Sequence, residues 1–287
     1  MDHWDEIRTA YQVAKHGTVS GAAAELGVHH ATVIRHIDAL EARLGVKLFQ
    51  RHARGYTPTE AGADLARVGQ TTEDQFSQLG ARLQGQGETI SGELVVTTLA
   101  VFSYLVVPAV AAFQQTHPGL RVRFLTGQRL FRLEYGEAHV AIRAGGAPQE
   151  PDNVAQHFHR IETALYAAPC YVERRGMPTE DTLDQHDFVG LDEGSGRAPF
   201  MRWLEEHVPN ERITFRATDD RSWSEAVRAG AALGWMPTDQ AEGLIEVLPP
   251  REEWASQLWL VTHVDLHRTA KVQAFLAHLK DWAKGWA

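Results

Sequence analysis

The sequence predicts an α/β protein made of a small helical head, one long linking helix and a larger two-lobed body. Three observations predict this order. Amphipathic helical segments follow one another closely up to residue 44, and two short strands come directly after them. A single long helical pattern begins at residue 59, and beyond residue 91 apolar strand segments alternate with helical ones. We place the domain boundaries at 1–58, 59–88 and 89–287.

Composition restricts the classes of function. With 287 residues and 44% hydrophobic side chains, the chain can bury the cores of two or three compact units. Its net charge of -9 means that contact with nucleic acid requires a local basic patch, and basic residues do gather between Arg35 and Arg54. The single cysteine, Cys170, excludes an internal disulfide framework and fits the reducing cytoplasm, where we expect the protein. The N-terminus does not resemble a signal peptide, and no run of about 18 apolar residues predicts a membrane span.

The sequence pattern predicts three helices in the head. Apolar residues at helical spacing predict a first helix that ends at Gly17, and Thr18 or Ser20 is the expected cap of a second. A third helix begins near His29. The predicted inner faces comprise Trp4, Ile7, Tyr11 and Ala14 in the first helix, and Val33, Ile37, Leu40 and Leu44 in the third.

The spacing between the second and third helices is typical of a helix-turn-helix. Ala23 is small enough for two helices to cross closely, and Gly27, four residues later, permits a sharp turn. Val28 and Val33 then seal the corner. The next segment, from Gly45 to Pro58, predicts two strands around a basic turn, a wing that presents Arg51 and Arg54 to a phosphate backbone.

The run ALEARLGVKLFQRHARGYTPTEAG, preceded by AAAELGVHHATVIRHI, resembles the DNA-binding region of the LysR-type transcriptional regulators. The resemblance extends through the whole chain in order and length. It implies a homodimer formed through the helix at 59–88, association into a tetramer, and an effector domain similar to periplasmic binding proteins. It further implies double-stranded promoter DNA and a small-molecule effector, often a carboxylate, as partners, with no cofactor, no membrane association and no enzymatic activity.

The start of the third helix departs from that family. The family commonly carries Ser, Gln and another Ser there, whereas this chain has the sequence HHATVIRH from His29, with Ile34 in place of the usual small hydroxyl residue. Because the first residues of a recognition helix enter the major groove, we expect base contacts there. The expected DNA-binding residues are His29, His30, Thr32, Arg35 and His36, with Arg51 and Arg54 on the wing. A zinc site made by His29, His30 and His36 is the disfavoured alternative.

The pattern from Thr59 predicts one long helix with an apolar seam for a partner helix. Thr59 and Glu60 cap it, and the stretch Gly85-Gln86-Gly87 is expected to end it as a hinge. A helix that lies on its own domain is the alternative. The seam consists of Ala61, Leu65, Val68, Thr72, Phe76, Leu79 and Leu83.

The body is predicted to contain parallel sheets joined by right-handed crossovers. Expected strands lie at 93–98, 120–126, 139–143, 188–191, 212–217, 233–237 and 258–262, with a helix at 102–116 and another at 270–286. We expect the chain to cross to a second lobe near 161 and to return near 250. Lobe I is then about 89–160 with 251–287, and lobe II is about 161–250.

An effector belongs between such lobes, at the carboxyl ends of strands and the N-termini of helices. For each hydroxyl a helix cap without a ligand is an equal alternative, and buried tryptophans are more often core residues. Asp219 and Asp220 suggest that a carboxylate effector also carries an amine or hydroxyl. The candidate effector contacts are Thr98, Ser103, Thr126, Gln128, Arg143, Ser195, Asp219, Ser222 and Trp223, with Trp235 as a second pocket wall.

Two other function classes remain alternatives. Fifteen histidines allow for a hidden enzyme site, and His157 and His159 are expected on one strand face. Motifs for a serine hydrolase, a zinc peptidase, a P-loop and a dinucleotide fold are absent from the sequence, which disfavours an enzyme. A solute-binding protein is disfavoured by the wing and by the absence of a signal peptide.

Overall fold

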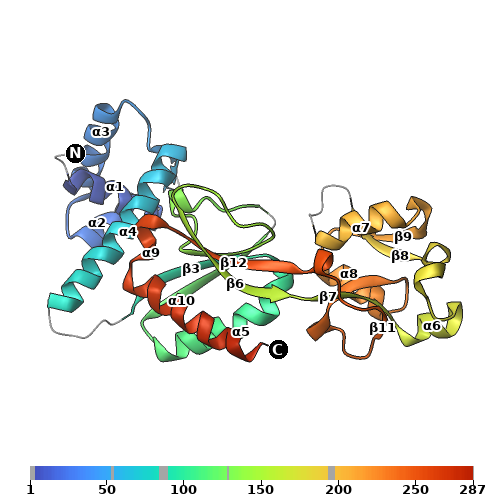
Figure 1. Ribbon diagram of the computed structural model, residues 1–287. Coiled ribbons are helices and arrows are strands. Elements are labelled where there is room, and N and C mark those ends of the chain that lie inside the picture. The colour runs from blue at the N-terminus through green and yellow to red at the C-terminus, as the bar shows by residue number, and fades with distance from the viewer. Residues whose placement is uncertain (1–3, 53–54, 84–89, 128, 193–197, 287) are drawn as a thin grey trace. The chain divides into compact units, whose positions relative to one another are not determined.

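The computed structural model describes residues 4–52, 55–83, 90–127, 129–192 and 198–286 (Figure 1). Contacts divide the chain into two compact units. The first comprises Met1–Gly92 with Arg132–Glu137, and the second comprises Glu93–Phe131 with Ala138–Ala287. None of the helices in the described ranges is long and apolar enough to cross a membrane.

The first unit begins with three helices, α1 (Trp4–His16), α2 (Val19–Leu26) and α3 (His30–Leu44). The Thr18 hydroxyl accepts a hydrogen bond from the Gly21 amide, which caps α2. Gly27 adopts a left-handed φ of 65° after α2, a conformation that favours glycine and turns the chain into α3. The shared core holds Ala10, Val13, Ala22, Ala23, Val33, Ile37, Leu40, Leu48 and Phe49. The predicted helix-turn-helix is therefore confirmed.

The wing is a two-stranded antiparallel hairpin. Strand β1 (Phe49–His52) pairs with β2 (Gly55–Pro58), so that Arg51 lies opposite Tyr56. Leu48 and Phe49 are buried in the helical core and fix the base of the hairpin to α3. The other predicted wing cation, Arg54, lies outside the described residues.

Helix α4 (Glu60–Leu83) packs closely on the wing and on α1. The Thr59 hydroxyl accepts a hydrogen bond from the Gly62 amide and caps the first turn. Gly62 and Gly69 permit this packing, because an added Cβ would lie 1.9 Å from the Leu48 carbonyl oxygen at Gly62 and 2.6 Å from the Tyr11 ring at Gly69. The predicted hinge at Gly85-Gln86-Gly87 lies outside the described residues.

The second unit contains a five-stranded sheet in the order β4-β3-β5-β12-β6. Its strands are β3 (Gly92–Thr98), β4 (Leu120–Thr126), β5 (Val140–Ala144), β6 (Asn153–Ile161) and β12 (Ser256–His263). Helices α5 (Ser103–Thr116) and α10 (Ala270–Trp282) pack on each other, with Phe113 and Phe275 in an edge contact. The short helices η1 (Ala100–Phe102) and α9 (Val264–His267) lie in its connections, and η7 (Ala283–Gly285) follows α10. The short helix η2 (Leu133–Tyr135) lies in the segment that contacts assign to the first unit.

The remaining strands form two smaller sheets, β10-β7-β11 and β8-β9. The elements of this lobe are β7 (Thr163–Ala167), α6 (Pro169–Arg175), η3 (Glu180–Gln185), β8 (Phe188–Leu191), α7 (Pro199–His207), η4 (Asn210–Arg212), β9 (Ile213–Ala217), α8 (Asp220–Arg228), β10 (Gly234–Pro237), η5 (Thr238–Gln240), β11 (Ile245–Leu248) and η6 (Glu252–Trp254). Trp203, Trp235 and Trp254 pack edge to face in its core, with interplanar angles of 63°, 80° and 83°.

The expectation of wholly parallel sheets is wrong. β3 pairs with β5, and β8 with β9, in parallel. β12, however, runs antiparallel to both β5 and β6, and β10 and β11 run antiparallel to β7. The physical reason is that β6 and β7 form one nearly continuous extended segment that leaves the first sheet and enters the second, and β12 returns beside it (Figure 1). Alternating strand and helix patterns did not predict β7 or β11, and β6 was expected only as a strand around His157 and His159.

The expectation that His157 and His159 share a strand face is also wrong. The register of β6 against β12 shifts there, so that Leu258 pairs with His159 and Trp259 with His157. Neighbouring residues on β12 point to opposite faces, and paired residues point to the same face, so the two imidazoles lie on opposite faces. They pack instead on separate tryptophans, His157 on Trp259 and His159 on Trp286.

Candidate functional site

The outward face of α3 carries most of the predicted base-reading residues. His29, His30 and Arg35 are exposed, and Thr32 is half-buried at the first turn. His29 is the N-cap residue and makes no side-chain cap bond, so its imidazole is available. The Arg35 guanidinium forms no ion pair with any described residue. A helix that presents unpaired donors in its first two turns has the layout of a recognition helix.

His36 lies on a different face of the helix. Its Nδ1 is 2.9 Å from the Thr9 hydroxyl on α1, and that hydroxyl donates its proton to the Asp5 carbonyl oxygen. Nδ1 therefore carries a hydrogen and donates to Thr9. Because this bond ties the half-buried imidazole to α1, the structure sets His36 apart from the outward residues His30 and Arg35. The same geometry separates it from His29 and His30 as a third zinc ligand.

The wing cation Arg51 is bound to α3. Its Nη2 lies 2.6 Å from the Asp38 carboxylate and 3.1 Å from that of Glu41. The Asp38 hydrogen bond, opposed by burial, raises the pKa of Arg51. These ion pairs make Arg51 a positioning residue that holds the wing to the third helix, and they reduce the charge that it can offer a phosphate.

Sequence reasoning missed Glu41, the buried carboxylate beneath the wing. Its side chain is 1% exposed, and it accepts from the Leu48 and Phe49 amides at 2.9 and 3.3 Å. Lys47 donates to it at 2.7 Å. Burial alone would raise the pKa of Glu41, but the hydrogen bonds from Lys47, Leu48 and Phe49 together lower it below its ordinary value. An acid between apolar residues at helical spacing was the available signal.

A second carboxylate, Glu73, joins α4 to α1. It accepts hydrogen bonds from the Tyr11 hydroxyl at 2.7 Å, from Gln12 at 3.1 Å and from Lys15 at 2.7 Å. Burial alone would raise the pKa of Glu73, but the hydrogen bonds from these donors outweigh it and lower the pKa. The network fixes the orientation of the long helix on the head, so a movement of α4 would carry the third helix with it.

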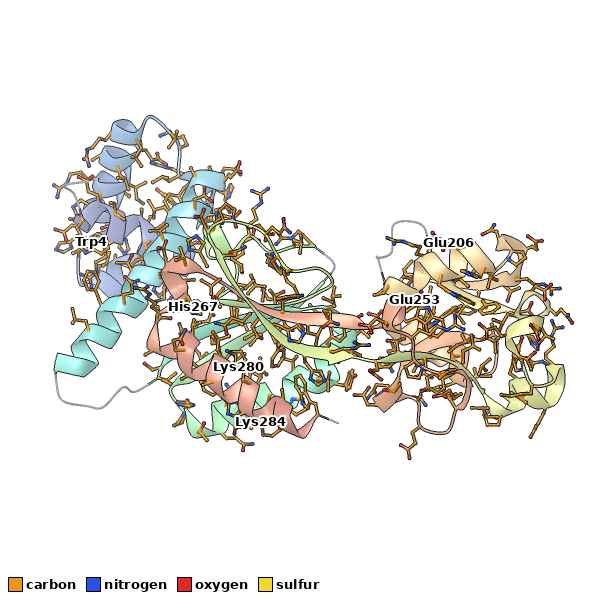
Figure 2. The ribbon with its side chains drawn as sticks, in the orientation of Figure 1. Trp4, Glu206, Glu253, His267, Lys280 and Lys284 are labelled. Atoms are coloured by element: carbon orange, nitrogen blue, oxygen red, sulfur yellow. The ribbon has the colours of Figure 1, made fainter. Side chains whose placement is uncertain are left out.

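The predicted seam of α4 divides into two parts. Ala61 and Leu65 pack against the core of their own head. Val68, Phe76 and Leu79 are exposed, at 66%, 57% and 40% of their surface. Trp4, which is labelled in Figure 2, is 46% exposed. Its ring meets the Phe76 ring edge to face, with the centroids 5.7 Å apart. The side chain of Leu83 lies outside the described residues.

Two of these exposed side chains, Trp4 and Phe76, line a groove between α1 and α4. Its volume is about 430 Å³. Two large aromatic rings that stay exposed at a groove are typical of a surface that another chain covers. The lining residues are Trp4, Ile7, Arg8, Tyr11, Gln12, Gly69, Glu73 and Phe76.

In the second unit, three predicted effector contacts lie at one edge of the first sheet. Thr98 ends β3 and pairs with Ile142, the residue before Arg143. The Gly127 amide, directly after Thr126, donates to the Thr98 carbonyl oxygen at 3.3 Å. Ser103 begins α5, close behind β3 in the chain. The structure thus brings Thr98, Thr126 and Arg143 together.

These residues differ in their availability to a ligand. Thr98 is 3% exposed, and its hydroxyl has no hydrogen-bond partner among the described residues. Thr126 is exposed. Arg143 is occupied, because it pairs with Glu150 at 2.9 Å and donates to the Phe131 carbonyl oxygen at 3.2 Å. Thr98 is therefore the buried member of this group, and its hydroxyl has no partner within the described part of the chain. Gln128 and Ser195 lie outside the described residues.

The second-lobe candidates satisfy one another. Asp219 caps α8, accepting from the Ser222 amide at 2.9 Å and from its hydroxyl at 2.7 Å. The Ser222 hydrogen bonds lower the pKa of Asp219. Trp223 is 4% exposed in the core, and its indole donates to the Trp235 carbonyl oxygen. The expectation that Trp223 and Trp235 wall an effector pocket is contradicted, because both indoles fill the lobe's own core.

Two contacts join the lobes of the second unit. The Val101 amide on η1 donates to Asp220 at the start of α8. The Tyr104 hydroxyl on α5 donates to the Asp239 carboxylate, whose oxygens lie at 2.9 and 3.0 Å. Burial, together with the charge of Asp239, raises the pKa of Tyr104. Sequence reasoning missed both contacts, since they join positions more than a hundred residues apart.

Metal binding gains no support from this geometry. Within the part of the chain that the structure describes, no group of three or more histidine, cysteine or carboxylate side chains has the spacing of a metal site.

Curated relatives resemble the chain along most of its length. An HTH-type transcriptional repressor of Pseudomonas aeruginosa is 28% identical over 290 residues, covering 96% of this chain and 90% of that protein. The HTH-type transcriptional activator IlvY of Salmonella typhimurium is 29% identical and covers 81% of each chain. TfdS of Cupriavidus pinatubonensis, an HTH-type transcriptional regulator, is 30% identical and covers 82% of each. Because these relatives are named as regulators of transcription, the enzyme alternative is set aside.

Solved structures share the fold. Full-length LysG of Corynebacterium glutamicum, described with bound effector Arg, matches with a TM-score of 0.69 at 17% identity and covers 98% of this chain and 97% of its own. A full-length OxyR variant of Pseudomonas aeruginosa matches with a TM-score of 0.68 at 18% identity and covers 98% and 94%.

Two family models match the chain in the order of its domains. The model for the bacterial regulatory helix-turn-helix protein, lysR family, matches residues 4–63. The model for the LysR substrate binding domain matches residues 87–284, which is more than half of the chain. The chain is therefore a LysR-type transcriptional regulator, with a helix-turn-helix for DNA and an effector-binding domain.

Proposed function

We propose that this regulator binds promoter DNA as a dimer through the outward face of α3, and that a small effector held beside Thr98 controls it. The observation that carries the DNA-binding half is the set of exposed donors on α3 that have no partner among the described residues. His29, His30 and Arg35 are the proposed base-reading residues, with Thr32 beside them. Arg51 acts by fixing the wing. Arg54 remains a proposed phosphate contact from its sequence position alone.

The test is a comparison of affinities. A duplex is enriched by the full-length protein from a random library, and a scrambled duplex of the same composition is the reference. Arg35→Ala should weaken binding to the enriched duplex by about 1–3 kcal/mol and leave the scrambled duplex nearly unchanged, if Arg35 contacts a base. Arg202→Ala, which changes a cation of the effector domain, is the matched control. An equal loss on both duplexes would assign Arg35 to a phosphate.

The dimer is proposed to form through 59–88, with a second copy of the chain covering Val68, Phe76 and Leu79. Dimerisation would place two recognition helices on two half-sites. Phe76→Glu should convert the dimer to a monomer in sedimentation, because a charge would then be buried in the interface. Val46→Glu changes an aliphatic residue of similar exposure outside α4 and should leave the dimer intact. Further association through the effector domains into a tetramer is proposed from the family resemblance.

The effector is proposed to be a small carboxylate that also carries a donor group. Thr98, Ser103 and Thr126 supply hydroxyls at strand and helix ends, where anions bind well. Asp220, a neighbouring acid, favours a ligand with an amine or hydroxyl opposite it. A thermal-shift panel of small carboxylates, with and without amino groups, tests this. Carboxylates that raise the melting temperature of the wild type should not raise that of Thr98→Val. If the variant keeps the same thermal shifts, the effector binds elsewhere.

A further inference from the structure

An aliphatic side chain occupies the middle of the outward face of α3. Ile34 is 38% exposed, and Ala31, one turn earlier, is exposed as well. The neighbours Val33 and Ile37 are fully buried, so the core of the head is complete without Ile34. A single exposed isoleucine is ordinary by itself. Its position matters here, because it lies between His30 and Arg35, the donors proposed to enter the major groove.

The surroundings of Ile34 suit a close approach to DNA. Asp38, the acid one turn later on the same face, is neutralised by its 2.6 Å ion pair with Arg51. Arg35, the adjacent cation, has no ion-pair partner among the described residues. The face around Ile34 is thus either apolar, cationic or charge-balanced, and phosphates on both sides of a groove would not be repelled by it.

The major groove offers an aliphatic side chain one apolar feature, the C5 methyl group of thymine. We propose that Ile34 reads a thymine methyl in each half-site, with Ala31 as its smaller neighbour, so that thymine is specified at that position by apolar contact. This inference rests on the proposed function of α3 as the base-reading helix. Ile34, which stands where the family usually has a small hydroxyl residue, would thus help to determine sequence specificity.

Thymine-to-deoxyuridine replacement tests the contact, since it removes the methyl group and keeps every hydrogen-bonding atom. The full-length protein first enriches a duplex from a random library, and each thymine of that duplex is then replaced singly. Burying one methyl group contributes about 0.8 kcal/mol, so one position in each half-site should lose about four-fold in affinity. Ile34→Ser should bind the thymine and deoxyuridine duplexes equally well.

Val46→Ser is the matched control. Val46 is 47% exposed in the segment before the wing and away from the outward face of α3, so this variant should keep the four-fold preference for thymine. A melting curve of each variant checks that the exposed substitutions leave the fold intact.

Each other outcome overturns the inference. If no thymine replacement changes the affinity of the wild type, methyl groups are not read. If Ile34→Ser keeps the same preference as the wild type, another residue or the shape of the duplex reads the methyl. If the wild type enriches no sequence at all, the proposed DNA-binding function is wrong too. The first two outcomes, by contrast, overturn only the role of Ile34.

Discussion

The N-terminal head and the effector domain treat their polar side chains differently. In the head, Glu41 and Glu73 accept hydrogen bonds from several donors of the fold, while His30 and Arg35 on the outward face of α3 have no partner among the described residues. In the effector domain Asp219 bonds to Ser222 and Arg143 to Glu150, while the buried Thr98 hydroxyl has no partner among the described residues. A binding surface can therefore be recognised where a single helix presents it, and is hard to recognise where distant strands must come together to form it.

The largest expected effect concerns the head. Glu41→Ala should lower its free energy of unfolding by about 3–5 kcal/mol, because the Leu48 and Phe49 amides and the Arg51 guanidinium would lose a buried partner. Denaturant unfolding of the full-length chain measures it. Asp38→Ala, which removes the exposed partner of Arg51, is the control and should cost at most about 1 kcal/mol. Similar losses in both variants would show that Glu41 has no special role beneath the wing.

The packing of α4 on the head is tested at two glycines of the same helix. Gly69→Ala should destabilise the protein by about 1–3 kcal/mol, because the new methyl group would overlap the Tyr11 ring. At Gly80, where an added Cβ meets no described atom within 4 Å, alanine should stabilise the helix by about 0.5–1 kcal/mol. Opposite signs in thermal melting support the described contact of α4 with α1. Stabilisation at both positions would contradict it.

The effector domain should respond to mild acid before the head does. Burial, together with the charges of Lys271 and Arg123, lowers the pKa of His139 from 6.5 to about 3. Below pH 6.5 the unfolded chain binds a proton that the folded chain does not, so stability is full above pH 6.5 and falls as the pH drops toward 3. The loss from this group reaches about 2 kcal/mol at pH 5.

His139→Gln isolates this effect, since a glutamine carbonyl can accept the hydrogen bond that the Val95 amide donates to His139 Nδ1. The variant's free energy of unfolding should change less between pH 7 and pH 5 than that of the wild type. Parallel curves would mean that His139 does not titrate as described. Glu41, whose pKa is lowered, should contribute a separate loss in the head as the pH falls below about 4.5.

The smallest effect contrasts two buried threonines of the effector domain. Thr98→Val should raise the stability of the ligand-free protein by about 1 kcal/mol, because the hydroxyl it removes has no described partner. Thr262→Val should lower stability by a similar amount, because it breaks the 2.9 Å bond to His267. Destabilisation by both substitutions would remove Thr98 as a position that awaits a ligand.

The two regions also differ in how far their sequence predicted them. The helix-turn-helix followed from local rules, the cap at Thr18, the turn at Gly27 and the apolar spacing of α3, because each depends on residues within a few turns. The antiparallel pairing of β12 did not follow, because it depends on where a segment returns after more than a hundred residues.

The same limit applied to the candidate site. Helical periodicity could predict the exposed residues of α3. It could not predict that His36 bonds to Thr9 on α1, or that Arg51 of the wing pairs with Asp38 on α3, because each partner lies on another element. Trp223 was a candidate pocket wall although buried tryptophans are more often core residues, and its burial with the bond to the Trp235 carbonyl oxygen places it in the core. The sequence predicted hydroxyls at strand ends. Whether each hydroxyl is free to bind a ligand depends on long-range contacts, which the sequence pattern did not reveal.

The affinity of the full-length protein for its enriched duplex, measured against the scrambled duplex at several salt concentrations, tests the central claim most directly. A recognition helix with unpaired donors predicts an affinity at least about a thousand-fold higher for the enriched duplex, with both affinities falling as salt rises. Equal affinities for the two duplexes at every salt concentration would contradict the claim that the outward face of α3 reads sequence.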